Sequence, residues 1–179
     1  MARALAGFFL LCFLVLHFAV KRHTWSSSEG LAGTGGSAKS FEATTLDHTK
    51  IDLAAVAKGR RLVILNFWES WCGPCKIEMP ELQQLYLAHK DEGLEIIGVY
   101  RSSPEQAVLS AVEEQSLSFP LLCDHDGAIS TAYGVNGVPT TVVVDSELKI
   151  VRRHLGIDRG LTAFVTQTLR TETHGGSRR

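Results

Sequence analysis

The chain has 179 residues, which is enough for one domain with a proper hydrophobic core plus terminal appendages. Its formal net charge is −1, and no stripe of basic residues runs along it, so the sequence argues against a nucleic-acid partner. Only two of its four cysteines are close in sequence, which excludes a disulfide-stapled scaffold and points instead to catalytic cysteines.

The N-terminus carries an uninterrupted apolar run from Ala4 to Val20, in which His17 is the only polar residue. Seventeen residues are at the short end of a membrane span and above the usual length of a signal-peptide apolar core. We therefore expect residues 1–23 to be a membrane anchor or a signal segment. Because no small-residue cleavage site follows, a retained anchor is favoured. Basic residues flank the run on both sides, so charge does not decide its orientation.

Composition divides the rest of the chain. Residues 24–40 are rich in serine and glycine and lack periodicity, which predicts a flexible linker. Residues 41–170 contain the periodic segments and are expected to form the folded domain. From residue 41 onward there are fourteen basic and eighteen acidic residues, a balance that suits a soluble body. Residues 171–179 are expected to be a disordered tail.

Within the domain, strand-like and helix-like segments alternate before a terminal pair of strands, which predicts an α/β fold with a mixed sheet flanked by helices. The expected elements, in chain order, are a hairpin or edge strand at 41–53, a helical turn at 52–58, a strand at 62–68, a helix at 73–91, a strand at 94–100, a helix at 103–115, a short helix ending near 133, strands at 140–145 and 150–154, and a helix at 158–169 that Asp158 caps.

Cys72 and Cys75 stand where the apolar strand at 62–68 runs into a helix. The unpaired amides of a helix N-terminus carry a partial positive charge that favours a thiolate over a thiol. The pair is therefore expected to be a redox dithiol, with Cys72 exposed as the nucleophile and Cys75 behind it. Half of a zinc site is the main alternative, but a second cysteine pair is then usual, and Cys12 and Cys123 are isolated. Two core cysteines without a redox role are a further alternative.

The segment Asn66-Phe-Trp-Glu-Ser-Trp-Cys-Gly-Pro-Cys-Lys76, followed by Pro80, resembles the active-site segment of the thioredoxin superfamily. More narrowly, it resembles the membrane-anchored, extracytoplasmic TlpA/ResA-like thiol–disulfide oxidoreductases. The resemblance covers about residues 41–170. It implies a thioredoxin-like fold with an N-terminal hairpin extension and a central insertion at about 102–133. It also implies that the domain lies on the extracytoplasmic side of the cell membrane.

The resemblance also implies roles for particular residues. Cys72 would attack a disulfide and Cys75 would resolve the mixed disulfide, for which Cys75 needs a base. Thioredoxins place a buried aspartate on the preceding strand, where this chain has Asn66. In the anchored branch, a glutamate three residues after the second cysteine takes part, and Glu78 occupies that position. The alternative for Glu78 is a carboxylate on a helix surface.

The substrate-binding residues follow from the same resemblance. Pro139 is expected to be cis and to pack beside the dithiol, while the backbone of Val138 pairs with the substrate peptide. Trp71 is expected to shield the dithiol and to shape the docking surface. Gly73 and Pro74 are expected to influence the redox poise, and this pair resembles reducing members of the superfamily. The Pro-Thr-Thr sequence at 139–141 makes a dedicated role in cytochrome c maturation less favoured.

The leading hypothesis is therefore an extracytoplasmic oxidoreductase that mainly reduces disulfides of exported proteins, supplied by a transmembrane electron donor. No cofactor beyond the cysteine pair and no metal is expected. The alternatives are a disulfide oxidase or isomerase, a thioredoxin-fold peroxidase, which the Trp-Cys-Gly-Pro-Cys segment disfavours, and a module that delivers Cu(I) to a respiratory oxidase. Cys123 and His125 are too few ligands for a metal site of their own.

Overall fold

The computed structural model describes residues 34–175, and the side chains of residues 34–171. The expected anchor or signal segment at 1–23 and the first part of the expected linker lie outside these residues. No helix in the described part of the chain is long and apolar enough to cross a membrane.

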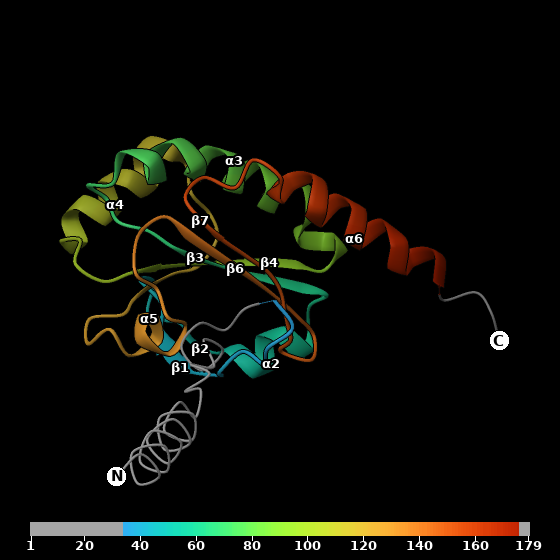
Figure 1. Ribbon diagram of the computed structural model, residues 1–179. Helices are drawn as coiled ribbons and strands as arrows, with labels where there is room; N and C mark the ends of the chain where they lie inside the picture. The colour runs from blue at the N-terminus through green and yellow to red at the C-terminus, as the bar shows by residue number, and fades with distance from the viewer. Residues whose placement is uncertain (1–33, 176–179) are drawn as a thin grey trace, which may run out of the picture.

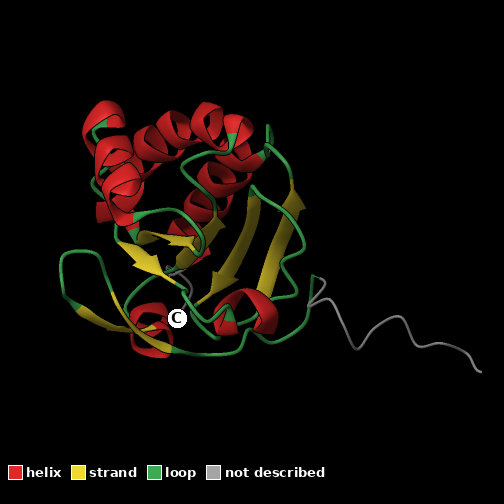
Figure 2. Cartoon of the chain, turned by 90° about the vertical axis from the view of Figure 1, so that its left-hand side faces the viewer, coloured by secondary structure: helices red, strands yellow, loops and turns green. Residues whose placement is uncertain are grey.

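A five-stranded mixed sheet forms the centre of the domain, with the strand order β5-β4-β3-β6-β7 (Figure 2). The central strand β3 (Leu62–Phe67) pairs in parallel with β4 (Leu94–Tyr100) and antiparallel with β6 (Thr140–Asp145). The outer strands are β5 (Leu121–Cys123), parallel to β4, and β7 (Ile150–Leu155), antiparallel to β6. This arrangement confirms the predicted mixed sheet.

Helices cover both faces of the sheet, as Figure 1 shows. One face carries α3 (Gly73–His89), which a 3-10 turn at Lys90–Glu92 follows, together with α4 (Glu105–Gln115) and α6 (Leu161–Gly175). The other face carries α2 (Leu53–Lys58) and α5 (Ala128–Ala132). These positions agree with the helices that the sequence predicts.

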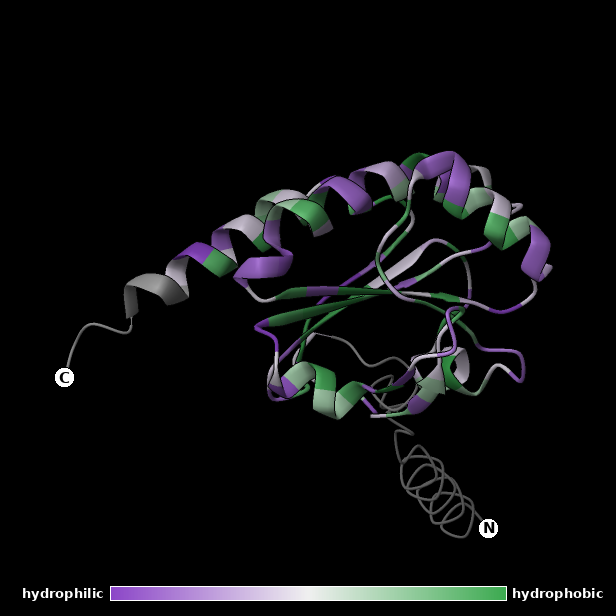
Figure 3. Ribbon diagram, turned by 180° about the vertical axis from the view of Figure 1, so that it is seen from behind, coloured by the Kyte–Doolittle hydropathy of each residue, from purple (hydrophilic) through white to green (hydrophobic). Residues whose placement is uncertain are grey.

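The sheet separates two apolar clusters, and β3 contributes to both. Leu62 and Ile64 belong to the cluster under α3 and α6, whereas Val63 and Leu65 belong to the cluster on the α2 side. Alternate side chains of a strand point to opposite faces, and here both faces are covered by helices. This explains why β3 is a continuous apolar run, and Figure 3 shows the hydrophobic strands between helices with hydrophilic outer faces.

The two predicted additions to the thioredoxin-like core are both present. An N-terminal hairpin is formed by β1 (Glu42–Thr44) and β2 (Lys50–Asp52). The insertion between β4 and β6 contains α4, β5 and α5, and it adds β5 to the edge of the sheet. A bridge between Thr45 and Leu122 joins the hairpin to this insertion.

Two boundaries differ from the prediction. Residues 34–40 do not form a free linker, because the Gly35 and Ala38 amides donate to the Ile150 and Leu148 carbonyls and the Ala38 side chain is buried. At the other end, α6 begins at Leu161 instead of Asp158 and continues to Gly175. The carboxylate of Asp158 binds a neighbouring arginine and a loop amide, so the helix starts later, and residues 171–175 belong to it instead of to a tail.

Candidate active site

Cys72 and Cys75 form a disulfide at the N-terminus of α3. Cys72 is the N-cap residue, and its Sγ accepts a hydrogen bond of 3.2 Å from the Cys75 amide. Cys72 is only 5% exposed, so the expectation of an exposed nucleophile is wrong for this disulfide form, in which its side chain packs against the cluster that contains Trp68. Cys75 is 1% exposed, which leaves Cys72 as the more accessible sulfur.

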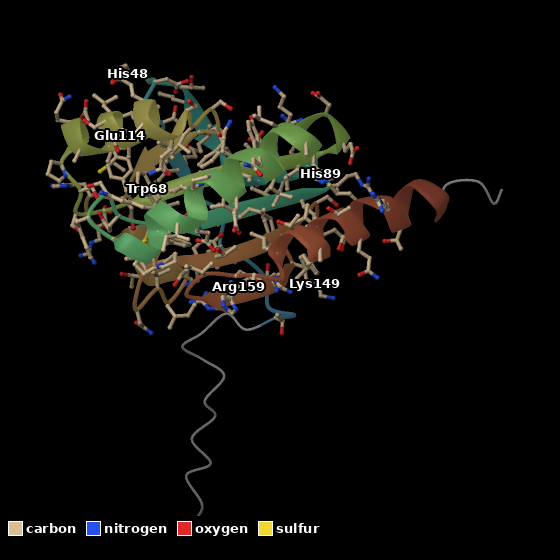
Figure 4. All side chains as sticks on the ribbon, turned by 90° about the horizontal axis from the view of Figure 1, so that it is seen from above. His48, Trp68, His89, Glu114, Lys149 and Arg159 are labelled. Carbon is tan, nitrogen blue, oxygen red and sulfur yellow. A yellow bond between two sulfur atoms is a disulfide. The ribbon has the colours of Figure 1, made fainter. Side chains whose placement is uncertain are left out.

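The residues around the dithiol differ in exposure. The side chain of Trp71 is 65% exposed, as a docking surface beside Cys72 requires. Gly73 and Pro74 are exposed in the first turn of α3, where the missing amide proton of proline breaks no helical hydrogen bond. In contrast, Trp68, labelled in Figure 4, is fully buried and belongs to the same apolar cluster as the two cysteines.

The Val138–Pro139 peptide bond is cis, as the family resemblance implies. It immediately precedes β6, whose Thr140 pairs with Phe67, the last residue of β3. Pro139 therefore enters the sheet at the edge from which the chain continues to the dithiol. Among the described residues, no group hydrogen-bonds the backbone N–H or C=O of Val138, so both are available to a peptide.

Glu78 is buried behind the dithiol, 3% exposed, on the same face of α3 as Cys75. Its two carboxylate oxygens accept hydrogen bonds from Asn66 Nδ2, at 3.0 Å, and from the Asp158 amide, at 3.1 Å. Burial raises the pKa of Glu78 above its ordinary value despite these two donors. The alternative of a carboxylate on the helix surface is therefore wrong.

The donors to Glu78 are themselves held in place. Asn66 Nδ2 also donates to Thr141 Oγ1 at 3.1 Å, and Asn66 Oδ1 has no partner among the described residues. Asp158 forms a two-pronged ion pair with Arg152, with both contacts at 2.6 Å. Burial alone would raise the pKa of Asp158, but Arg152 and the Gly160 amide outweigh it and lower that pKa.

Glu69 is a buried residue whose function the sequence prediction missed. Its Oε1 accepts from the amides of Arg101, at 3.1 Å, and Ser102, at 2.8 Å, and its Oε2 accepts from the Ser103 hydroxyl. The carbonyl of Glu69 accepts from the Cys72 amide at 3.1 Å. Glu69 thus connects the turn before the dithiol to the loop after β4. An acidic residue that directly follows an apolar strand and a buried tryptophan was the available signal.

A groove of about 560 Å³ opens next to the dithiol turn. Trp71 and Val138, the residues immediately before Cys72 and Pro139, lie on its wall. Its floor is mostly apolar, and its only charged lining residues are Glu69 and Arg101. A peptide that follows Val138 would therefore place its neighbouring side chains in this groove.

Cys123 lies on the edge strand β5 and is a free, exposed thiol outside the disulfide. Burial raises the pKa of its thiol, which argues against a reactive thiolate. Within residues 34–171, no three His, Cys, Asp or Glu side chains gather as a metal site would require.

Comparison with known proteins agrees with this geometry. A family model described as AhpC/TSA matches residues 34–153. The chain is 37% identical over 131 residues to the thiol-disulfide oxidoreductase ResA of Halalkalibacterium halodurans, covering 73% of both chains. It is also 37% identical over 130 residues to ResA of Bacillus cereus, covering 73% of this chain and 74% of that one.

Solved structures give the same result. A thiol:disulfide interchange protein from Bacteroides sp. superposes with a TM-score of 0.70 at 28% identity, covering 83% of this chain and 97% of the other. StoA from Bacillus subtilis superposes with a TM-score of 0.62 at 26% identity, covering 73% and 96%. With a cysteine pair at the start of α3 and a cis proline before β6, the chain belongs to the AhpC/TSA family and is a thiol–disulfide oxidoreductase similar to ResA.

Proposed function

We propose that this oxidoreductase acts outside the cytoplasm and mainly reduces disulfides of exported proteins. The Cys72 thiolate attacks one sulfur of a substrate disulfide and releases the other sulfur as a thiolate, which takes up a proton. The Cys75 thiolate then attacks Cys72 Sγ and releases the second substrate thiol. Two electrons pass to the substrate, and the protein is left with the Cys72–Cys75 disulfide.

The observation that carries the reductive direction is the charge around the dithiol. A dithiol is a strong oxidant when its thiolate form is well stabilised, commonly by a cation. Here Cys72 Sγ accepts a single amide, and no ion pair or hydrogen bond of the described residues brings a cationic side chain to it. The buried carboxyl of Glu78 lies behind the pair, and its negative charge disfavours thiolates. Both features favour the disulfide over the dithiol.

Glu78 supplies the base for the resolving step. Cys75 is almost fully buried, which raises the pKa of a thiol, so its deprotonation needs a nearby acceptor. A carboxyl whose own pKa is raised toward neutrality suits that transfer. The substrate peptide pairs with the backbone of Val138 and rests against Trp71, while Gly73 and Pro74 keep the first turn of α3 clear of side chains that would block its approach.

The location is inferred from the apolar run at 4–20, which would hold the domain at the membrane. A reductase on the extracytoplasmic side cannot draw on cytosolic thiols, so its disulfide must be reduced again by a transmembrane electron donor. The partners are then disulfide-bearing exported proteins and that donor. The role of the N-terminal segment is tested by asking whether the full chain stays with membranes after carbonate washing.

The direction is tested by the reduction potential of the Cys72–Cys75 pair, measured on the full chain in dithiothreitol and glutathione buffers. We expect a value below about −240 mV, more reducing than glutaredoxins at about −200 to −230 mV and protein disulfide isomerase at about −180 mV. A value above about −180 mV would make the same residues an oxidase or isomerase and would overturn the reductive assignment.

A further inference from the structure

Arg101 places a positive charge on the wall of the groove beside the dithiol. It follows directly after β4, and its guanidinium lies against Gly127, where an added Cβ would come within 2.6 Å of Arg101 Cζ. Gly127 has a φ of +72°, a conformation that also favours glycine. The backbone of the insertion therefore leaves the space that the guanidinium occupies.

The charge of Arg101 is not paired within the part of the chain that the structure describes. Among the described residues, no hydrogen bond or ion pair engages its guanidinium. Glu69 is the other charged residue of the groove, but its two oxygens already accept three hydrogen bonds from the 101–103 loop. The groove thus presents one cation without a counterion, although the domain as a whole is acidic.

The position of Arg101 is tied to the dithiol through its backbone. The Arg101 amide donates to the Glu69 carboxylate, and the Glu69 carbonyl accepts from the Cys72 amide. Glu69 therefore links the backbone of Arg101 to the backbone of Cys72 through one hydrogen bond to each. Apart from Glu69, Arg101 and the two serines Ser102 and Ser130, the groove lining is apolar and includes Val99, Val135 and Val138.

We propose that Arg101 makes the enzyme prefer substrate segments that carry an acidic side chain close to the attacked cysteine, next to an apolar side chain that fills the groove. The carboxylate of the substrate accepts a charge-assisted hydrogen bond from the guanidinium. This inference rests on the proposed function, since it names the substrate class of the same site. Because the pair is open to solvent, the preference is modest, about fivefold in kcat/KM, and added salt weakens it.

The test uses the full chain, returned to its dithiol form after each turnover by dithiothreitol, and three cyclic peptides, each with one internal disulfide and identical except for Glu, Gln or Lys two residues from a cysteine. The rate without the protein is subtracted. Rates are followed by chromatography of the reduced peptides and are divided by the rate of each peptide with dithiothreitol, which removes differences in the disulfide itself. We expect kcat/KM to fall in the order Glu, Gln, Lys. In Arg101→Gln the Glu-to-Gln ratio should fall to about 1, and Arg101→Lys should restore part of it.

Lys149→Gln is the matched control, because it removes one exposed positive charge at the β6–β7 turn, far from Trp68 at the dithiol end (Figure 4). It should keep the wild-type ratio. Equal rates for the three peptides, or an unchanged ratio in Arg101→Gln, would overturn the proposal. The ratio is also measured with peptide dithiols and the oxidised protein. A preference seen only in that direction would refute the reductive function while supporting the role of Arg101.

Discussion

Replacing Glu78 by glutamine removes the negative charge behind the dithiol and leaves the shape of the side chain nearly unchanged. The new amide can keep one of the two hydrogen bonds that Glu78 accepts, but its NH₂ group then faces a donor. Leaving a buried donor unsatisfied costs about 1–3 kcal/mol. Asn66 can rotate its amide so that Oδ1 accepts from the new NH₂ group, and the Thr141 hydroxyl, which now accepts from Nδ2, can then donate to Oδ1. We therefore expect the variant to fold, with a loss of about 1 kcal/mol at low pH.

The pH dependence of stability has a definite sign. Burial raises the pKa of Glu78 in the folded protein, so folding disfavours the ionised form. The wild type is then most favoured below the unfolded-state pKa of about 4.5 and loses stability as pH rises through the raised folded-state pKa. Glu78→Gln lacks this loss. In urea unfolding of the oxidised proteins, the free energy of unfolding of the variant should rise relative to that of the wild type between pH 4 and pH 8.

The kinetic effect is larger. Loss of a general base slows a proton-transfer step by about 100-fold or more. In the wild type, the resolving step should accelerate as Glu78 ionises and then level off. In Glu78→Gln it should accelerate only at the higher pH at which the Cys75 thiol ionises unaided. Stopped-flow tryptophan fluorescence, with reduced protein and a peptide disulfide in excess, follows this step.

Glu81→Gln is the control, since Glu81 lies one turn further along α3 and is exposed. It should leave the rate and the pH profile unchanged. If Glu78→Gln shows the wild-type rate and profile of the resolving step, Glu78 is not the base, whatever its effect on stability.

Three further predictions follow from the described contacts. Cys75→Ser should accumulate a mixed disulfide through Cys72, visible as the mass of protein plus substrate, whereas Cys72→Ser should not; equal trapping by both would reverse the assigned roles. Arg152→Ala leaves the Asp158 carboxylate buried without its cation and should cost about 3 kcal/mol at pH 7. The lowered pKa of Asp158 stabilises the folded protein at pH values above 3.8, the pKa of Asp158 in the unfolded chain. The difference in unfolding free energy between wild type and Arg152→Ala should therefore shrink as pH falls below 3.8, and a constant difference would contradict this account. Ala38→Asp in the full chain puts a charge where the 34–40 segment packs on the domain and should cost about 2 kcal/mol in urea unfolding; no loss would restore the view of a free linker.

The fold could be predicted from the sequence where a buried element appears as a continuous run of apolar residues. β3 and β4 are continuous apolar runs because helices cover both of their faces, and such runs are visible without knowing which residues they touch. The segment 34–40 could not be recognised in this way. Its order comes from backbone hydrogen bonds to the Leu148 and Ile150 carbonyls, more than a hundred residues later, and serine and glycine give no local sign of such pairing.

The site shows the same division. Cys72, Cys75 and Pro139 lie in short motifs that can be recognised from a few neighbouring residues. The structure brings their segments together, since the strands next to them are paired. Glu69 was missed because its role depends on three donors that lie more than thirty residues away. The burial of Glu78 was likewise not decided by its spacing from Cys75, since a helix position becomes a buried site only when another element covers it. Here that cover is the loop before α6.

The exchange of a strand aspartate for Asn66 is best understood together with Glu78. An aspartate at position 66 would place a second buried carboxylate within hydrogen-bond distance of the first, and one of the two would have to remain protonated. Asparagine instead donates to Glu78 and to Thr141, so it positions the carboxylate without competing for a proton. In the function proposed above, the base therefore lies on α3, the helix that carries both cysteines. Glu78 therefore keeps its register with Cys75 through any shift of that helix, while burial raises its pKa and the hydrogen bonds from Asp158 and Asn66 oppose that rise.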